Sequence, residues 1–370
     1  MKDKGPTYFV TKPSMPPLEE YVKLLEDIWT SRVVTNGGPY HKLLESSLEK
    51  YLHVKNLSLC SNGTIGLLLA LKALDISGEV ITTPYSFIAT SHSLLWNGLR
   101  PKFVDIEPNG FNIDPLKVQE AITKDTVAIL AVHCYGEPCN LELLDDIAKK
   151  NNLRLIYDAA HAFGVKYDNR SILSYGDMSV LSFHATKVFH TFEGGAIVAN
   201  SESLKQKIDI QKNFGFKNEM EIEALGINGK MSEINAAFGT LALKYIDTSI
   251  AKRRMVDLAY RDELDGMKGI KMHTFPQNVT PNFSYFPIII DNNFKKTRDQ
   301  IYQSLAERNY FSRRYFYPLI TNFSYYKKII SENLSNLKNA NKMSESILCL
   351  PIYEDLPMEG VKAICNVIKG

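Results

Sequence analysis

One lysine stands between two short apolar runs in a context that suits covalent chemistry. Lys187 follows the run Met178–Phe183, and Gly194 and Gly195 then open a second run, Ala196–Ala199. A lysine at a strand end, beside small residues, can hold an aldehyde cofactor as a Schiff base, because partial burial lowers the pKa of its amine and makes it nucleophilic. A lysine taken alone is more often a surface residue, so the assignment of Lys187 depends on the neighbouring motifs.

An aspartate precedes this lysine by about one strand–loop–strand unit. Asp158 comes directly after the predicted strand Leu153–Tyr157. A carboxylate at that place can pair with a protonated pyridine nitrogen and keep the ring an electron sink. A helix N-cap is the alternative role for Asp158. Together, Asp158 and Lys187 are the acid and the Schiff-base lysine that pyridoxal 5'-phosphate requires.

The same cofactor needs a phosphate-binding site. Gly63 and Thr64 lie in a short polar turn before the helical run Leu67–Leu74, so free backbone N–H groups would face an anion there. We expect the hydroxyls of Thr64 and Ser182 to add contacts. A simple helix cap is the alternative interpretation of this turn.

Two ring-bearing residues complete the predicted pocket. Phe87 follows the predicted strand Glu79–Thr83 and is placed to stack on a cofactor ring, although a lone phenylalanine is more often part of a core. His161 can reach the phenolic oxygen of the cofactor or be hydrogen-bonded within the core. We assign no chemistry to His184.

The elements that would position these residues alternate along the chain. Strands are predicted at Glu79–Thr83, Lys102–Asp105, Thr126–Val132, Leu153–Tyr157, Met178–Phe183 and Ala196–Ala199, and helices at Ser86–Asn97, Pro115–Ala121 and Asn140–Lys150. This rhythm predicts an α/β domain whose mostly parallel sheet is covered by helices on both faces. Ligands of such sheets bind outside the carboxyl ends of the strands.

A smaller domain is expected after the sheet. Residues Met231–Tyr245 and Ile250–Leu264 read as two helices that lead the chain out of the large domain. A strand at Phe283–Ile290 and a helix from Lys296 to Arg308 then indicate a smaller α+β domain. We therefore predict a large domain over residues 1–250 and a smaller one over residues 251–370.

Composition excludes several classes of protein. The chain has 370 residues, 45% of them hydrophobic and 23% charged, with a net charge of +2 and no long basic block, so we expect no nucleic acid partner. Neither a signal peptide nor a membrane span is predicted. The five cysteines form no CxxC pair, which favours reduced thiols, no metal site and a cytoplasmic location.

With these residues identified, the chain resembles the DegT/DnrJ/StrS family of sugar aminotransferases over nearly its whole length. The resemblance rests on a set of motifs in one order: Val34–Pro39, Ser61–Thr64, Thr83–Thr90, Pro101–Ile106, Asp158–His161, Ser182–Ala196, Asn228–Glu233 and Arg313–Leu319. It implies the aspartate aminotransferase fold, fold type I, with a large domain and a smaller C-terminal one.

The resemblance also implies residue roles. Lys187 would hold pyridoxal 5'-phosphate, Asp158 would bind its ring nitrogen and Phe87 would lie on its face. Gly63, Thr64 and Ser182 would bind the phosphate. Asn228 matches a position that enters the neighbouring subunit's phosphate site, which implies a homodimer with shared active sites. Candidate contacts of the nucleotide sugar are Arg313, Tyr315 and Tyr317, for which ordinary packing is the alternative.

The implied reaction moves an amino group from L-glutamate to a keto sugar carried by a nucleotide. The residues around Lys187 resemble members that aminate C4 of a 4-keto-6-deoxy sugar, so we expect dTDP-4-keto-6-deoxy-D-glucose as substrate and a role in surface polysaccharide (O-antigen) synthesis. Amination at C3 is one alternative. Another enzyme of the same fold, such as a cysteine desulfurase or an aldolase, and a non-catalytic regulatory protein that binds the cofactor are the others.

Overall fold

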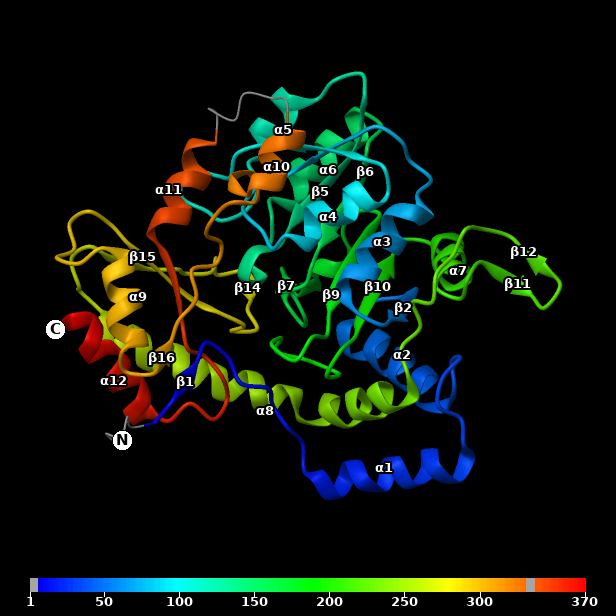
Figure 1. The fold of residues 1–370 in the computed structure, drawn as a ribbon, viewed down its shortest axis with the longest axis horizontal. Coiled ribbons are helices and arrows are strands. Elements are labelled where there is room, and N and C mark those ends of the chain that lie inside the picture. The colour runs from blue at the N-terminus through cyan, green and yellow to red at the C-terminus, as the bar shows by residue number, and fades with distance from the viewer. Residues whose placement is uncertain (1–5, 331–336) are drawn as a thin grey trace.

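The computed structural model describes residues 6–330 and 337–370 (Figure 1). Residues 1–5, part of the N-terminal stretch considered above for a signal peptide, lie outside the described residues. The main element is a seven-stranded sheet with the order β2-β10-β9-β6-β5-β3-β4. Its strands are β2 (Leu57–Cys60), β3 (Glu79–Thr82), β4 (Arg100–Phe103), β5 (Thr126–Val132), β6 (Arg154–Asp158), β9 (Met178–Ser182) and β10 (Gly195–Ala199).

The predicted α/β class with a mostly parallel sheet is confirmed. Strands β9, β6, β5, β3 and β4 pair in parallel, and only β10 runs antiparallel to both of its neighbours, β9 and β2. Each of the six predicted strands is present within a few residues of its expected bounds. The sequence analysis missed β2, which is only four residues long.

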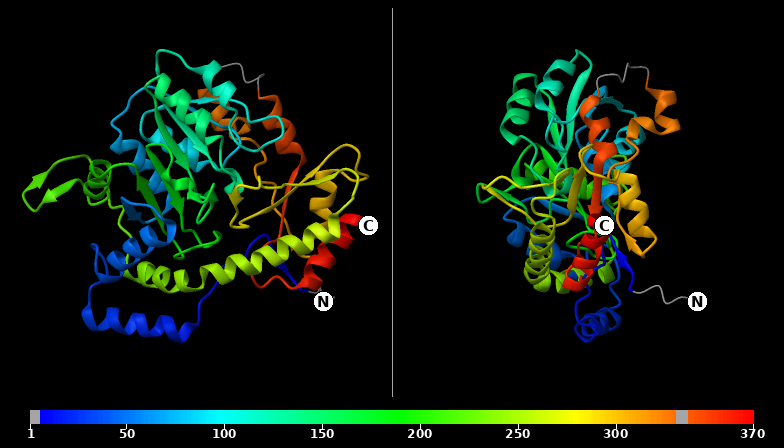
Figure 2. Two further views of the ribbon diagram at one scale, coloured as in Figure 1. Left: turned by 180° about the vertical axis from the view of Figure 1, so that it is seen from behind. Right: turned by 90° about the vertical axis from the view of Figure 1, so that its left-hand side faces the viewer.

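Helices cover both faces of the sheet (Figures 1 and 2). Side chains alternate between two apolar clusters: Leu130 and Ile197 face one side, whereas Ile129 and Val198 face the other. Burial on both faces explains why these strands are continuous apolar runs. One face carries α3 (Gly63–Ala73), α4 (Ala89–Trp96) and α7 (Glu202–Gln211), and the other carries α2 (Pro39–Leu52), α5 (Pro115–Ala121), α6 (Leu141–Lys150) and the first half of α8 (Glu233–Leu264).

The prediction of two helices between Met231 and Leu264 was wrong, because α8 is one helix of 32 residues. The polar residues Asp247, Thr248 and Ser249 suggested a break, yet each lowers helix propensity by only about half a kcal/mol. Packing against α1 (Leu18–Ser31), α2 and α12 (Met358–Lys369) outweighs that cost. The helix therefore continues from the large sheet into the C-terminal part of the chain.

The C-terminal part has its own apolar core. Its antiparallel sheet has the order β13-β15-β17, and the predicted strand and helix near residues 283–308 are observed as β15 and α9. Val256 and Tyr260 of α8 and Tyr8 near the N-terminus join this core. We keep a domain boundary near residue 250 as a proposal, and that position lies inside α8. The bounds are β13 (Ile270–Met272), β15 (Phe286–Ile290), β17 (Ile347–Leu350), α9 (Arg298–Ala306), α10 (Ser324–Ile329) and α11 (Lys338–Ser346).

Short elements connect these layers. A hairpin of β11 and β12 projects from the body beyond α7, and α1 runs alongside α8, away from the sheet (Figure 1). The short strands and 3-10 turns are β1 (Tyr8–Phe9), β16 (Tyr310–Phe311), β7 (Lys166–Tyr167), β8 (Arg170–Ser171), β14 (Val279–Thr280), β11 (Phe216–Asn218), β12 (Glu221–Ile222), η1 (Cys134–Gly136), η2 (Ile172–Ser174) and η3 (Ile320–Asn322).

Every cysteine is a buried free thiol. Within residues 6–330 and 337–370, no helix combines the length and apolarity needed to cross a bilayer.

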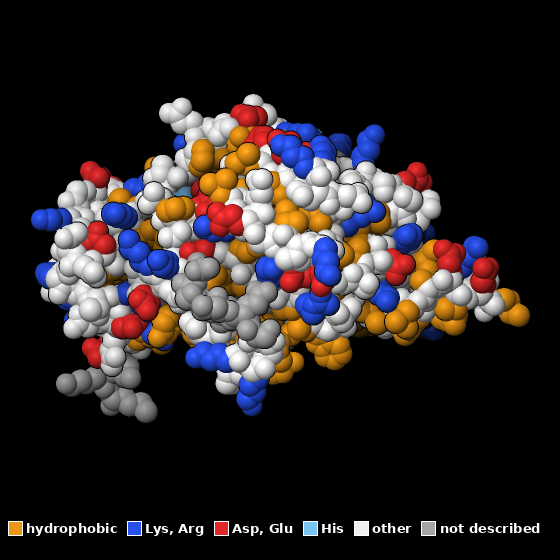
Figure 3. All heavy atoms as spheres, turned by 90° about the horizontal axis from the view of Figure 1, so that it is seen from above, with side chains coloured by type: hydrophobic (Ala, Val, Ile, Leu, Met, Phe, Trp, Pro, Cys, Tyr) orange, Lys and Arg blue, Asp and Glu red, His pale blue; other side chains and the backbone are white. Residues whose placement is uncertain are grey.

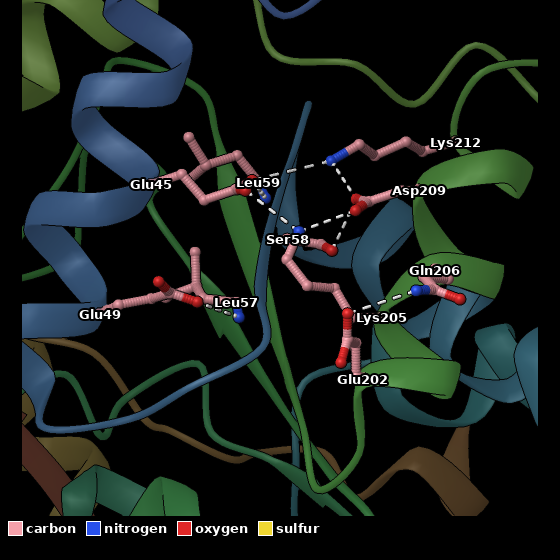
Figure 4. A network of polar contacts seen from close by, with 10 residues as sticks. All are labelled: Glu45, Glu49, Leu57, Ser58, Leu59, Glu202, Lys205, Gln206, Asp209 and Lys212. Atoms are coloured by element: carbon pink, nitrogen blue, oxygen red, sulfur yellow. Dashed lines mark hydrogen bonds and ion pairs between the residues drawn. The ribbon is translucent and has the colours of Figure 1, made fainter.

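A network of charged residues closes the β2 edge of the sheet (Figure 4). The carboxylates of Glu45 and Glu49 on α2 accept hydrogen bonds from the backbone N–H groups of Leu59 and Leu57, at 3.3 and 3.0 Å. Edge-strand N–H groups that lack partners promote pairing with other chains, so the two glutamates protect this edge.

The same network joins α2 to α7. Lys205 bridges Glu45 and Asp209 at 3.1 and 2.7 Å, and Lys212 lies 2.6 Å from Asp209. Ser58 of β2 donates to the same Asp209 carboxylate at 2.7 Å. Because Lys212 is almost fully buried, its charge depends on these partners.

Replacing Glu45 by alanine should lower the free energy of unfolding by about 1–3 kcal/mol, because the Leu59 N–H group and Lys205 lose a hydrogen-bond acceptor and Lys212 loses an ion-pair partner. Urea unfolding monitored by circular dichroism would measure this change. Asp145→Ala is the matched control, since it breaks an exposed lysine pair with Lys149 that water already screens. Equal effects of the two substitutions would contradict a stabilising role of the network.

Candidate active site

A cavity of about 510 Å³ lies at the carboxyl ends of the parallel strands. Both polar and apolar groups line it, and they come from the loops after β2, β3, β6 and β9 and from the C-terminal part of the chain. The sequence-predicted residues that line it are Gly63, Thr64, Phe87, Asp158, His161, Ser182, Lys187 and Tyr315. The topology therefore brings together residues that lie up to about 250 positions apart in the chain, as parallel sheets do at this edge.

Lys187 lies in the loop between β9 and β10. Backbone hydrogen bonds close this loop at its base, from Phe183 N–H to the Gly194 carbonyl and from Thr191 N–H to the Phe183 carbonyl. The amine points into the cavity, where Nζ lies 3.4 Å from the hydroxyl of Tyr285. Burial lowers the pKa of Lys187 to about 8, although the negative charge of Asp158 opposes this shift. The amine is thus partly neutral near pH 8 and can act as a nucleophile.

Asp158 ends β6 and is only 6% exposed. Its two carboxylate oxygens accept hydrogen bonds from the Thr90 hydroxyl, at 2.7 Å, and from the Ala160 N–H group, at 3.2 Å. Burial raises the pKa of the carboxyl group, whereas these hydrogen bonds and the charge of Lys187 lower it. A cationic N–H group in the cavity would be a fitting partner for this carboxylate.

The polar turn after β2 forms the N-terminus of α3. The Asn62 side chain caps the helix by accepting a hydrogen bond from Ile65 N–H at 2.8 Å. A Cβ atom on Gly63 would lie 2.9 Å from the Ser182 Cβ, so glycine is needed for the helix to start directly against the end of β9. Free N–H groups, the helix dipole and the hydroxyls of Thr64 and Ser182 together form a site suited to an anion.

His161 lines the cavity as a neutral ring. Its Nδ1 accepts a hydrogen bond from the Tyr135 N–H group at 3.1 Å, and burial and the charge of Lys187 lower its pKa well below the usual value. The proton of the neutral ring therefore resides on Nε2, which can donate to a ligand oxygen. Phe87 lies on the wall just before α4 and is 62% exposed, so its ring is available to a ligand.

Three sequence-predicted residues do not line this cavity. Asn228 is exposed and forms an isolated bridge with Asn213. Arg313 is also exposed, and its backbone pairs with that of Cys349. Tyr317 stacks against the guanidinium groups of Arg298 and Arg314, with 4.6 and 5.0 Å from each Cζ to the ring centroid. Their proposed roles remain predictions.

The sequence analysis missed several residues of the cavity. Tyr285 lines the cavity and accepts a hydrogen bond from Lys187, and Thr90, just behind the cavity wall, donates one to Asp158. A tyrosine before a strand and a threonine in a helix give no sequence signal of their own. His184, to which no chemistry was assigned, lies on the cavity wall with Glu193, and Nε2 is 3.6 Å from the glutamate oxygen. The segment around Lys187 could have indicated both, since both lie within it.

The whole chain can now be compared with known protein families. The DegT/DnrJ/EryC1/StrS aminotransferase family matches residues 18–369, and the chain belongs to this family.

Individual relatives agree with this assignment. The chain is 50% identical to a dTDP-4-amino-4,6-dideoxy-D-glucose transaminase of Shigella dysenteriae, over 98% of both chains. It is 49% identical to a protein of the same name from Escherichia coli, over the whole of both chains. Among solved structures, DesI in the presence of its TDP-sugar product has a TM-score of 0.93 at 32% identity, covering 98% of this chain and 92% of that one. These similarities confirm the predicted aspartate aminotransferase fold, fold type I, and the transaminase class.

The pKa of Lys187 can be tested without any ligand. In the cofactor-free protein, we expect the rate of reductive methylation of Lys187 to reach half its maximum near pH 8, because burial disfavours the charged amine. The amines of exposed lysines generally have a pKa of about 10.4. Peptide mass spectrometry after brief exposure to formaldehyde and a hydride donor would follow each lysine separately. Reaction of Lys187 in parallel with the exposed lysines would contradict a buried amine.

Proposed function

We propose that this chain is a pyridoxal 5'-phosphate-dependent aminotransferase that moves an amino group from L-glutamate to C4 of a nucleotide-linked 4-keto-6-deoxy sugar. The proposed conversion is dTDP-4-keto-6-deoxy-D-glucose to dTDP-4-amino-4,6-dideoxy-D-glucose, for surface polysaccharide (O-antigen) synthesis. The observation that carries the proposal is that Lys187 and Asp158 meet in one buried cavity of a chain about half identical to two transaminases of that name.

The residues of the cavity fit the cofactor. The α3 N-terminus with Thr64 and Ser182 would hold its phosphate, and the buried Asp158 carboxylate would hold its ring nitrogen. Phe87 would cover the ring and His161 Nε2 would donate to its phenolic oxygen. The unpaired N–H groups at the start of α3 favour an anion, and the buried carboxylate favours a cation. The cofactor supplies both, as its phosphate and its protonated ring nitrogen. When bound, it supplies the electron sink that stabilises a carbanion next to nitrogen.

The protein's own residues then move protons. Lys187, as a neutral amine, would take a proton from Cα of the amino donor and return it at C4′ of the cofactor, as general base and then general acid. The lowered pKa of Lys187 suits both directions near neutral pH. Asp158 would keep the ring nitrogen protonated throughout, since burial makes an unpaired carboxylate costly.

The first test is the absorption spectrum of the protein loaded with pyridoxal 5'-phosphate. We expect a long-wavelength band from the lysine-bound cofactor, which L-glutamate should convert to the shorter-wavelength band of the pyridoxamine form. Lys187→Ala should lack the first band and all turnover, because no other lysine lines the cavity among the described residues. A wild-type band that glutamate leaves unchanged would contradict L-glutamate as the donor.

The sugar is tested with the pyridoxamine form of the enzyme. Equal concentrations of dTDP-, UDP- and GDP-linked 4-keto-6-deoxy sugars, together with a dTDP-linked 3-keto sugar, would be compared by kcat/KM. We expect the dTDP-linked 4-keto sugar to react fastest. Preference for the 3-keto sugar would refute amination at C4.

We also propose a homodimer with shared active sites. Large hydrophobic side chains are exposed along the β11–β12 hairpin and its flanks, and Figure 3 shows this hairpin projecting from the body at the right. They are Phe214, Phe216, Met220, Ile222, Leu225 and Ile227. Apolar surface of this extent on one arm marks an interaction site, and a second copy of the chain is the expected partner. Asn228 lies at the base of this arm and would enter the partner's phosphate site.

Mixing two inactive variants would test this arrangement. Lys187→Ala and Asn228→Ala each damage both sites of their own homodimer. In a mixed dimer, one site carries both lesions and the other carries neither, so co-refolding should restore about a quarter of wild-type activity for a symmetric two-site dimer. Native mass spectrometry would confirm the mixed species. Mixed dimers that remain inactive would show that Asn228 acts within its own chain.

A further inference from the structure

Among the residues that the structure describes, Tyr285 is the one whose side chain accepts a hydrogen bond from the Lys187 amine. Its hydroxyl lies 3.4 Å from Lys187 Nζ, a distance at the long end of a hydrogen bond, as is common for catalytic groups without ligand. The ring lines the cavity and packs between aromatic neighbours, with centroids 4.7 Å from His161, 5.6 Å from Tyr135 and 5.9 Å from Tyr315. This packing fixes the position of the hydroxyl.

The backbone that carries Tyr285 is anchored to the other side of the site. The Asn282 amide donates to the carbonyls of His161 and Phe163, both at 2.9 Å, and the Ser284 hydroxyl donates to the His161 carbonyl at 3.1 Å. Residues 282–285 precede β15 of the C-terminal part, whereas His161 and Lys187 lie in the loops that follow β6 and β9 of the large sheet. One short segment therefore holds the backbone of His161 and reaches the Lys187 amine at the same time.

The charges around the pair leave the phenol neutral. Burial raises the pKa of Tyr285 well above its usual value, and the buried guanidinium of Arg253 opposes this only in part. Asp158, Cys134 and His161 are the other titratable groups that interact with Lys187. A neutral phenol can accept a hydrogen bond from a protonated amine and donate one to a neutral amine, so it can serve Lys187 in both states.

We propose that Tyr285 is a positioning residue, whose hydroxyl holds the free Lys187 amine in place between its two proton transfers. The proposal rests on the function proposed above. A lysine side chain has four rotatable bonds and loses up to about 2 kcal/mol of rotamer entropy when it is ordered. The Tyr285 hydroxyl, as a fixed acceptor, reduces the number of rotamers open to the Lys187 side chain before each proton transfer. Such prior orientation lowers the activation free energy of the transfer.

Tyr285→Phe removes the hydroxyl and keeps the ring. In the cofactor-free protein we expect the pKa of Lys187, measured by reductive methylation, to fall by roughly half a unit to one unit, because the charged amine loses an acceptor. In the loaded enzyme we expect kcat to fall about ten- to a hundredfold, with KM for the keto sugar and for glutamate nearly unchanged.

Tyr260→Phe is the matched control. Tyr260 is fully buried in the C-terminal core, stacks on Phe286 next to Tyr285 in sequence, and its hydroxyl has no partner among the described residues. It should leave both the pKa of Lys187 and kcat at their wild-type values.

Two results would overturn the proposal: a folded Tyr285→Phe with the wild-type Lys187 pKa, or one in which KM alone changes. If Tyr285→Phe does not fold, Ser284→Ala loosens the same segment, and its failure to move either quantity would also overturn it. A shifted pKa in a protein that transfers no amino group would support the Tyr285 contact and refute the proposed function instead.

Discussion

Burial of charge is the constraint on which the site depends. Lys187 and Asp158 lie in the same cavity, and the low polarity of their surroundings disfavours the charged form of each, while each favours the charge of the other. Fixed groups stabilise both charges: the Thr90 hydroxyl and the Ala160 N–H group donate hydrogen bonds to the acid, and the Tyr285 hydroxyl accepts one from the amine. The rest of the fold serves to bring these groups to one edge of the sheet and to keep water from replacing them.

The parallel sheet does this by geometry. Successive strands end at the same edge, so segments that follow β2, β3, β6 and β9 meet although they are distant in sequence. Gly195 allows two of these segments to approach each other closely. A Cβ atom on Gly195 would lie 2.8 Å from the backbone carbon of Asn62 and 2.9 Å from Gly63 N, so the start of β10 can pass directly beside the start of α3. The anion site and the lysine loop are thereby parts of one compact wall.

Much of this arrangement could be predicted from the sequence, because strand periodicity and the residues that follow each strand are local signals. The predicted strands, the α/β class and the residues Lys187, Asp158, Gly63, Thr64 and Ser182 on the cavity wall all followed from such signals. The continuous helix α8 did not, since its polar stretch near Ser249 reads as a break until its packing against other helices is known. Tyr285 could not be predicted either, because its importance comes from a contact across 98 residues that no local pattern encodes. The roles predicted for Asn228, Arg313 and Tyr317 would involve a second subunit or a bound nucleotide sugar, and they remain predictions.

The backbone around Gly229 links two parts of the molecule that the chain otherwise separates. Gly229 N–H donates to the Lys212 carbonyl at the end of α7, and the Gly229 carbonyl accepts from Ser61 N–H at the beginning of the anion site, at 2.9 and 2.8 Å. Gly229 lies a few residues after β12, where the chain returns from the projecting hairpin to the body of the molecule. The ion pairs of Asp209 with Lys205 and Lys212 belong to the charged network that joins α7 to α2. Two backbone hydrogen bonds at one glycine therefore join the segment after the hairpin both to the end of α7 and to the beginning of the anion site, so these three parts form one hydrogen-bonded unit.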